Sequence, residues 1–262
     1  MNTLPSLTIV MPVLNEERNV SAAIKSALYA LDCHKIEGEL IVVNDGSSDQ
    51  SEKIVCDLMK NHPRIKLINH KRPLGIGASF WDGVRQAKNE YVTCFPGDNE
   101  NDALDALTYY HLAQKVDVII PFIHNVEVRS YWRRTVSACY RFIINLSFGT
   151  NLNYTNGTII YNRSILSNLK PISSGFIYQA EILIRLIREG YLYAETPNFL
   201  KTRNFGKSKA LYFKSISMVI IDFIRLFWCI HIVRTHGRMK NPSSLHPKSM
   251  TLERVKGRGV MV

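Results

Sequence analysis

The first half of the chain alternates short apolar segments with segments of helical spacing, and this alternation constrains the fold more than any other feature. The predicted strands are residues 7–11, ended by Pro12, and residues 40–43, 65–68, 91–95 and 116–121. A helix is predicted near 102–113, and the less regular second half includes a short predicted strand at 199–203. Segment 40–43 is continuously apolar, as expected for a strand that is covered on both faces. Alternating strands and helices form right-handed units around a mostly parallel sheet. We therefore predict an α/β fold, with a mostly parallel central sheet and helices on both faces.

Acidic and polar residues follow three of these strands at the point where each strand ends. Asn15 and Glu16 follow the first strand, Asp45 the second, and Asp98 and Glu100 the fourth. Since the carboxyl ends of parallel strands share one edge, where open α/β sheets bind ligands, these residues should meet in one cleft. Acids gathered in one cleft are unfavourable unless a cation or hydrogen-bond donors join them. A nucleotide diphosphate and its metal provide both, with the base and ribose donating to Asp45 and the metal bridging Asp98 to the diphosphate.

Two features leave this interpretation open. Asp98 and Glu100 also suit an acidic turn that caps the next helix, at about residue 102. Gly75-Ile76-Gly77 lacks the third glycine of a dinucleotide fingerprint and follows the third strand, so it is weak evidence for a phosphate loop.

The chain is basic, with a formal net charge of +11 over 262 residues. This charge suggests nucleic acid, an anionic membrane or a phosphorylated substrate, without choosing among them. Five cysteines without a CxxC pair argue against a zinc site or a disulfide framework. The N-terminus lacks the pattern of a signal peptide, so we expect none.

Residues 211–233 have the spacing of an amphipathic helix. Lys214, Asp222 and Arg225 fall on one narrow face, and the opposite face carries Ile216, Val219, Phe223, Leu226, Phe227 and Ile230. Both packing into the core and docking on a membrane surface are compatible with this pattern, whereas the charges argue against a simple spanning helix. From Arg234 onward, basic residues outnumber the single acid Glu253, which predicts a solvated and largely disordered tail.

Several stretches resemble a known family. TIVMPVLNEERNV, IVVNDGSSDQS and LGIGASFWDGVRQAKNEYVTCFPGDNE resemble family-2 glycosyltransferases with the A-type nucleotide-sugar fold. WRRTVSACYRFI, NYTNGTIIYNRSIL, GFIYQAEILIRLIREGYLYAETP and TRNFGKSK resemble the dolichyl- and polyprenyl-phosphate sugar transferase branch. The resemblance covers about residues 7 to 230.

The resemblance implies roles for individual residues. It places Pro12, Asn15 and Glu16 in the first nucleotide loop and makes Asp45 the residue that recognises the base. Asp98 matches the second aspartate of the DxD motif, and Glu100 a nearby ligand of Mg²⁺ or Mn²⁺. Arg133 or Arg134 would face the acceptor phosphate, near the stretch that contains Arg203, Gly206, Ser208 and Lys209. Asp98, Arg133, Arg203 and Lys209 are thus the implied catalytic residues.

The sequence departs from the family at two places. Pro96 stands where the family has the first aspartate of DxD, and residues 153–158, NYTNGT, lack the aspartate of a DPTSGF-like stretch.

The resemblance implies a catalytic domain at 1–205, an interfacial helix at 206–233 and the basic tail at 234–262. It predicts an inverting transferase that moves a sugar from a UDP- or GDP-sugar to a polyprenyl phosphate. The enzyme would be peripheral, on the cytosolic side of the membrane. One alternative is transfer to a sugar hydroxyl of a surface glycan with Glu181 as base, although its spacing to Arg185 equally suits a surface ion pair. Another is a non-catalytic nucleotide-sugar binder. Nucleic-acid binding fits poorly, because acids occupy the positions that phosphates would need.

Overall fold

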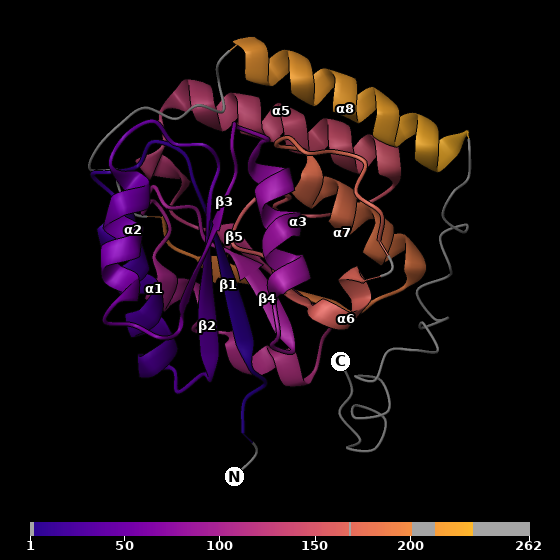
Figure 1. Cartoon of the computed structure of the whole chain (residues 1–262). Helices are drawn as coiled ribbons and strands as arrows, with labels where there is room; N and C mark the ends of the chain where they lie inside the picture. The colour runs from indigo at the N-terminus through magenta and orange to yellow at the C-terminus, as the bar shows by residue number, and fades with distance from the viewer. Residues whose placement is uncertain (1–2, 168, 201–212, 233–262) are drawn as a thin grey trace.

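The computed structural model describes residues 3–167, 169–200 and 213–232, which form one seven-stranded sheet with helices on both faces (Figure 1). The strands are β1 (Leu7–Val13), β2 (Gly38–Asn44), β3 (Ile65–Asn69), β4 (Tyr91–Cys94), β5 (Val118–Ile123), β6 (Ile160–Asn162) and β7 (Tyr193–Asn198). Their order is β3-β2-β1-β4-β6-β5-β7, and only β6 is antiparallel to its neighbours among these strands. The predicted mostly parallel α/β sheet is confirmed.

The described helices connect and cover these strands. They are α1 (Val20–Cys33), α2 (Ser51–Met59), α3 (Ile76–Gln86), α4 (Ala103–Ala106), α5 (Tyr131–Phe148), α6 (Arg163–Leu166), α7 (Tyr178–Glu189) and α8 (Phe213–His231). Two short 3₁₀ segments, η1 (Tyr110–Gln114) and η2 (Val126–Val128), precede β5 and α5 respectively.

Two apolar clusters fill the space between the sheet and its helices. On one face, Ile9 and Met11 of β1 pack in a cluster with α1, α2, α4 and η1. On the other face, Val10 packs in a cluster with α3 and α7. Because successive side chains of a strand point to opposite faces, the fully buried and mostly apolar β1 serves both clusters.

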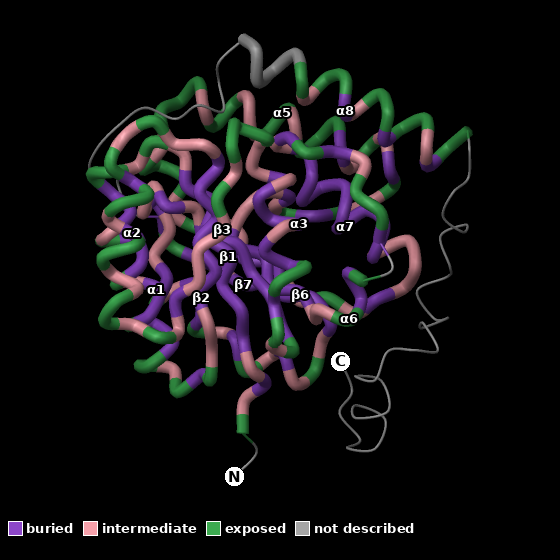
Figure 2. Tube along the Cα trace, viewed as in Figure 1, coloured by how far each residue is buried: buried purple, intermediate pink, exposed green. Residues whose placement is uncertain are grey.

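A third cluster joins α5, α7 and α8 outside the sheet layers. Ile144 and Phe148 of α5 pack with Ile184 of α7 and with Leu226 and Ile230 of α8. Figure 1 shows α5 and α8 running across one end of the molecule, and Figure 2 shows that both helices expose much of their outer sides. In the described part of the chain, no helix is both long and apolar enough to span a membrane.

The structure separates residues that the helical pattern placed on one face of α8. Asp222, expected on the same narrow face as Arg225, is 8% exposed and accepts a hydrogen bond from the hydroxyl of Ser173 at 2.6 Å, whereas Arg225 is exposed. Phe227, expected on the opposite apolar face, is 39% exposed. One side of α8 therefore packs on the protein, and its outer side is largely apolar with Arg225 among the exposed residues.

Several expected boundaries are also wrong. The first strand does not end at Pro12 but continues to Val13. Pro12 is tolerated at this position. Its carbonyl accepts the N–H of Gly97, beyond the end of β4, so the backbone nitrogen of Pro12 also lies on the β4 side of the strand. The absence of an N–H at Pro12 therefore removes no hydrogen bond to β2. The helix expected near 102–113 is a single turn, α4, followed by η1. The strand expected at 199–203 is reduced, within the described residues, to an isolated bridge between Leu200 and Asn101.

Candidate active site

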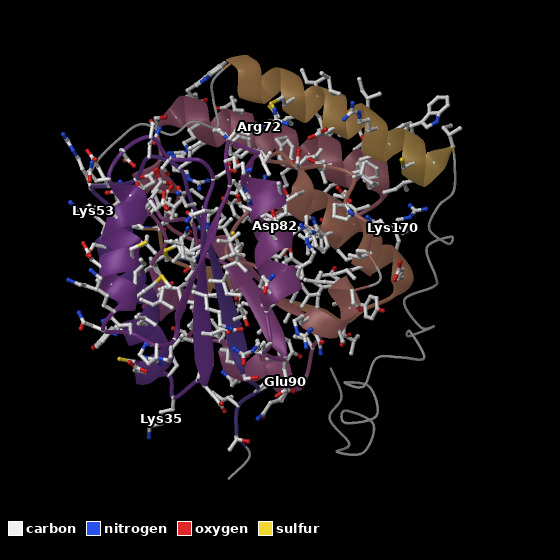
Figure 3. The ribbon with its side chains drawn as sticks, viewed as in Figure 1. Lys35, Lys53, Arg72, Asp82, Glu90 and Lys170 are labelled. Atoms are coloured by element: carbon white, nitrogen blue, oxygen red, sulfur yellow. The ribbon has the colours of Figure 1, made fainter. Side chains whose placement is uncertain are left out.

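The chain order of the strands reverses between β1 and β4, which places a crevice outside their carboxyl ends. After β1 the chain adds β2 and β3 on one side, and then returns to place β4 on the other. Such a switch point is the usual ligand site of an open α/β sheet. In Figure 3, Arg72 lies at this end of the molecule, whereas Glu90, directly before β4, lies at the opposite end.

The loops after β1 and β2 are held together by side-chain hydrogen bonds. Asn15 adopts a positive φ of 55°, and its Oδ1 accepts the backbone N–H of Ser48 at 2.8 Å. The backbone N–H groups of Asn15 and Glu16 donate to the hydroxyls of Ser47 and Ser51. As predicted, Asn15 and Glu16 lie at the same edge as the second loop. The hydrogen bonds of Asn15 to Ser47 and Ser48 join the loop after β1 to the loop after β2.

Asp45 does not present its carboxylate to the crevice as the base-recognising role would require. Its side chain is 6% exposed. One oxygen, Oδ1, accepts the backbone N–H of Leu74 at 2.7 Å, and Oδ2 accepts that of Gly75 at 2.9 Å. Asp45 Oδ1 also lies 2.8 Å from Nδ1 of His70. Asp45 therefore holds the loop that precedes α3, so that an effect on a nucleotide would pass through this loop.

His70 was missed by sequence reasoning, although it directly follows β3 and so carries the same signal that singled out Asp45. Its Nε2 lies 2.9 Å from Oδ2 of Asp82 on α3, so one buried imidazole bridges two carboxylates. Each ring nitrogen of His70 thus faces an oxygen of a different carboxylate. The network Asp45–His70–Asp82 thereby connects β2, β3 and α3 behind the crevice.

The loop after β4 brings together three of the predicted site residues. The backbone N–H of Glu100 donates to Oδ1 of Asp98 at 3.2 Å, and Asn99 between them has a φ of 57°. Glu100 is 8% exposed, and its Oε2 lies 3.4 Å from Nη2 of Arg133 on α5. The structure thus pairs the expected metal ligand Glu100 with the expected acceptor-phosphate residue.

The two arginines that sequence reasoning left as alternatives occupy different positions. Arg133 reaches Glu100, whereas the guanidinium of Arg134 lies 5.9 Å from the ring centroid of Tyr131 on its own helix. The structure therefore favours Arg133 as the site residue. Arg203, Gly206, Ser208 and Lys209 lie outside the described residues.

A second arginine at the start of α5 also escaped sequence reasoning. Arg129, two residues before α5, donates to the hydroxyl of Tyr154 at 3.1 Å. Tyr154 belongs to the NYTNGT stretch that departs from the family, so this divergent stretch contacts the segment that leads into α5. Arg129 itself stands in no pattern that marks a site in the sequence.

Asp98 and Glu100 fit a divalent cation only if a substrate supplies further ligands. No group of three or more His, Cys, Asp or Glu side chains is arranged to hold a metal in the part of the chain that the structure describes. Mg²⁺, however, is commonly bound by one or two carboxylates together with substrate phosphates. The residues present are therefore compatible with a metal–diphosphate complex, with Asp98 as the first ligand and Glu100 available once Arg133 moves.

Glu181 is not the surface residue that sequence reasoning allowed. Its side chain is 1% exposed, and it accepts the backbone N–H groups of Ile172 and Ser173 and Nη1 of Arg185. Burial raises the pKa of the Glu181 carboxyl, and these hydrogen bonds only partly oppose the rise. A buried carboxylate with such partners suits the internal ion pair and not a base that contacts an acceptor.

Cys94, at the end of β4, is not a candidate nucleophile. Burial raises the pKa of its thiol to about 12, and the nearby Asp98 carboxylate acts in the same direction. The thiolate is the reactive form of cysteine, so Cys94 is unreactive at neutral pH.

The sheet order, the switch point and the acidic loops define a protein of the Rossmann-like α/β class. Within that class, the chain belongs to glycosyl transferase family 2, whose family model matches residues 8–170.

Two relatives have names that state their lipid acceptors. A dodecaprenyl-phosphate galacturonate synthase from Rhizobium johnstonii is 25% identical over 171 residues, which cover 63% of this chain and 50% of that protein. A dolichyl-phosphate beta-glucosyltransferase from Trichomonas vaginalis is 30% identical over 96 residues, covering 35% of this chain and 28% of that one. The chain spans half or less of the length of these relatives.

Two solved structures share the fold at low identity. Glucosyl-3-phosphoglycerate synthase from Mycobacterium tuberculosis, solved with UDP, has a TM-score of 0.64 at 17% identity, covering 85% of this chain and 80% of that one. A mannosyltransferase from Pyrobaculum calidifontis, solved with GDP-mannose and Mn²⁺, has a TM-score of 0.64 at 16% identity, covering 92% and 67%.

Proposed function

We propose that this protein is an inverting glycosyltransferase that moves a sugar from a UDP- or GDP-sugar onto a polyprenyl phosphate at the cytosolic face of a membrane. The observation that carries the proposal is the position of Arg133, a cation from α5 placed against the acids of the switch point. An anionic acceptor needs such a cation to approach an anionic donor. The lipid phosphates in the names of two relatives support the same acceptor class.

The donor diphosphate would lie outside the carboxyl ends of β1 and β4. Asn15 and Glu16 shape one wall there, while the network around Asp45 fixes the loop before α3. Asp98 and Glu100 would hold Mg²⁺ or Mn²⁺, and a bound cation of this kind offsets the charge that develops on a departing diphosphate.

The acceptor would be held by arginine and lysine side chains. A phosphate oxygen is already anionic, so it needs no general base, and catalysis rests on positioning and charge. Arg133 would turn from Glu100 to the phosphate, with which a guanidinium forms paired hydrogen bonds. The family resemblance adds Arg203 and Lys209 to this group.

Transfer to a sugar hydroxyl would need a base that removes the hydroxyl proton. Glu181, the only base suggested for that reaction, is buried among its own partners, which favours the phosphate acceptor over the hydroxyl.

The test is a transfer assay with the full chain, a panel of UDP- and GDP-sugars and a short-chain polyprenyl phosphate, with the product identified by mass spectrometry. We expect a glycosyl phospholipid from one nucleotide sugar only when the phosphate is present. Transfer to an oligosaccharide but not to the phosphate would contradict the proposed acceptor. Binding of a nucleotide sugar without any transfer or hydrolysis would indicate a non-catalytic binder.

A further inference from the structure

Large apolar side chains that are exposed in the described structure gather on two helices. On α5 they are Tyr131, Trp132, Phe142, Ile143 and Leu146, between 49% and 79% exposed. On α8 they are Met218, Ile220, Ile221, Ile224, Phe227 and Trp228, between 39% and 59% exposed. We call these two sets together the α5–α8 surface. Scattered exposed apolar residues are ordinary, whereas a contiguous group of this kind marks an interaction site.

The two helices are fixed side by side, so their exposed apolar residues lie on adjacent parts of the molecular surface. Phe148 of α5 contacts the rings of Phe223 and Phe227 of α8, with ring centroids 5.8 and 6.2 Å apart. Nε2 of His231 lies 2.9 Å from the carbonyl oxygen of Ser147. These inward contacts satisfy one side of each helix and leave the other side apolar and uncovered by any described segment (Figure 2).

The exposed apolar residues of α5 were not predicted from the sequence, where only the arginines of this segment were singled out. Residues 132, 139, 143 and 146 recur at helical spacing on its exposed side, and Cys139 among them is exposed. A helix that is apolar on both its packed and its exposed sides needs a second apolar environment.

The charges around the surface point to an anionic partner. Arg134, Arg141 and Arg225 are exposed on the two helices, and the described acid of these helices, Asp222, is buried and lies 3.7 Å from Nη1 of Arg225. Directly after α8, residues 234–262 carry seven Lys or Arg and one acid. Two copies of such a surface would bring like charges together, whereas anionic lipid headgroups would offset them.

The position of the surface relates it to the candidate active site. Tyr131 and Trp132 precede Arg133, so the first turn of α5 supplies both the edge of the apolar surface and the cation that reaches Glu100. Tyrosine and tryptophan are the residues that favour the level of lipid headgroups.

We propose that the α5–α8 surface docks on an anionic lipid membrane, with the first turn of α5 at headgroup level, so that Arg133 lies where a lipid phosphate enters the site. This inference rests on the proposed function. It adds α5 to the docking element and fixes the face of the molecule that meets the membrane.

The chain carries its own probes for a test. Cys139 lies on the α5–α8 surface, while Cys33 of α1 and Cys56 of α2 are exposed elsewhere. Each cysteine of the full chain is labelled with a charged, membrane-impermeant maleimide, without vesicles, with phosphatidylcholine vesicles, or with vesicles that also contain phosphatidylglycerol. We expect Cys139 to be labelled in solution and protected only on the anionic vesicles, while Cys33 and Cys56 react equally throughout. Equal labelling of Cys139 on anionic vesicles would overturn the proposal, as would protection in the absence of lipid.

A paired variant tests the apolar contribution. Phe142→Glu with Leu146→Glu replaces two side chains that are 65% and 73% exposed, and Tyr29→Glu replaces one of 62% on α1 as the control. We expect the double variant to lower the partition coefficient for anionic vesicles on the order of 100-fold, because two apolar side chains that would be buried in the lipid on docking are lost. The Tyr29 variant should bind as wild type. Equal binding of all three proteins, or a dimer of the wild type that the double variant abolishes, would contradict the membrane partner.

Transfer to a water-soluble acceptor phosphate separates this inference from the proposed function. If docking is absent but transfer to the soluble acceptor occurs, only the docking surface is wrong. If the protein docks as expected but transfers nothing, the proposed function is wrong.

Discussion

Nη2 of Arg133 lies 3.4 Å from Oε2 of Glu100, with 27% and 11% of the two side chains exposed. This contact joins α5 to the loop after β4, at the switch point of the sheet. Since the guanidinium contacts one acid of the candidate site, a metal bound at Asp98 and Glu100 would be coupled to a phosphate bound at Arg133. A cation at Glu100 would compete with Arg133, and an anion that draws Arg133 away would remove this competition.

The first prediction concerns the arginine of this pair. Arg133→Gln should raise the KM for the acceptor phosphate about 10–100-fold, because a hydrogen bond to a charged group contributes about 1.5–3 kcal/mol. The same variant should bind Mn²⁺ with UDP or GDP at least as tightly as wild type, since the guanidinium no longer competes for Glu100; titration calorimetry measures this directly. Arg134→Gln is the matched control and should leave both quantities unchanged. Equal acceptor KM values for the two variants would show that Arg133 does not contact the phosphate.

The second prediction compares the two carboxylates of the β4 loop. Asp98→Asn should lower turnover by more than the roughly 10–100-fold that follows removal of an outer partner of a metal site. Glu100→Gln should lower turnover less, because Pro96 leaves Asp98 as the acid that matches the DxD motif. The measurement is turnover before and after treatment with EDTA and re-addition of Mn²⁺. The control is Asp102→Asn, whose side chain caps α4. Wild-type turnover that persists in EDTA would remove the metal from the mechanism.

The third prediction separates a positioning role of Asp45 from direct contact with the base. Asp45→Asn should weaken UDP or GDP binding, because the loop at Leu74 and Gly75 loses one of the two carboxylate oxygens that accept its N–H groups. If Asp45 acts through the network, Asp82→Asn at the far side of His70 should weaken binding in the same direction, by a smaller factor. Calorimetry without metal measures both. If Asp82→Asn binds UDP or GDP with wild-type affinity while Asp45→Asn binds much more weakly, Asp45 contacts the base directly and does not act through the network.

The fourth prediction concerns the buried pair of Glu181 and Arg185, with side chains 1% and 3% exposed. Glu181→Ala should lower the free energy of unfolding by about 3–5 kcal/mol, because it leaves the buried guanidinium of Arg185 and the N–H groups of Ile172 and Ser173 without their acceptor. Adding Arg185→Met should recover part of the loss, and denaturant unfolding of the four proteins gives the coupling. Additive losses would show that the two side chains do not interact.

The pH dependence of stability provides a separate check on Glu181. Burial raises its pKa in the folded state above the ordinary 4.5, so the native protein binds the proton more tightly than the unfolded chain. Its contribution is therefore fully present below about pH 4.5 and is lost as the pH rises through the folded pKa. The stability difference between wild type and Glu181→Gln should shrink over this window. A difference that grows with pH would mean that the folded pKa is lowered.

The parts of the fold that the sequence predicted are those with local signals. Segments 40–43 and 65–68 are strands because apolar runs bounded by turns have few alternatives, and their parallel pairing follows from the intervening helices. No pattern in the sequence indicated the antiparallel direction of β6. This strand has three residues, and its direction depends on pairing with β4 and β5, which lie far away in the sequence. The single turn of α4 likewise depends on tertiary contacts that a helical pattern does not reveal.

For the candidate site, the order of strands and loops in the sequence predicted that the acidic residues lie at the carboxyl edge of the sheet. It did not predict which partners each side chain contacts. Asp98 and Glu100 were correctly placed at the carboxyl end of β4, and Arg133 meets them only because α5 folds back over that end. Asp45 was placed at the right edge and given the wrong surroundings, since its partners come from the loop after β3. Contacts between loops depend on loop geometry, which no spacing in the chain specifies.

The hydrogen bond between Asp222 and Ser173 has a consequence for how α8 is oriented about its own axis. Most of the described side chains around this helix are apolar, so hydrophobic packing alone would accept several rotations of nearly equal energy. A buried carboxylate that finds its hydroxyl partner in only one rotation removes that degeneracy, much as one polar residue fixes the register of a coiled coil. Asp222→Leu could therefore leave the protein folded and helical while allowing α8 to turn, so that the residues of its outer side are no longer defined.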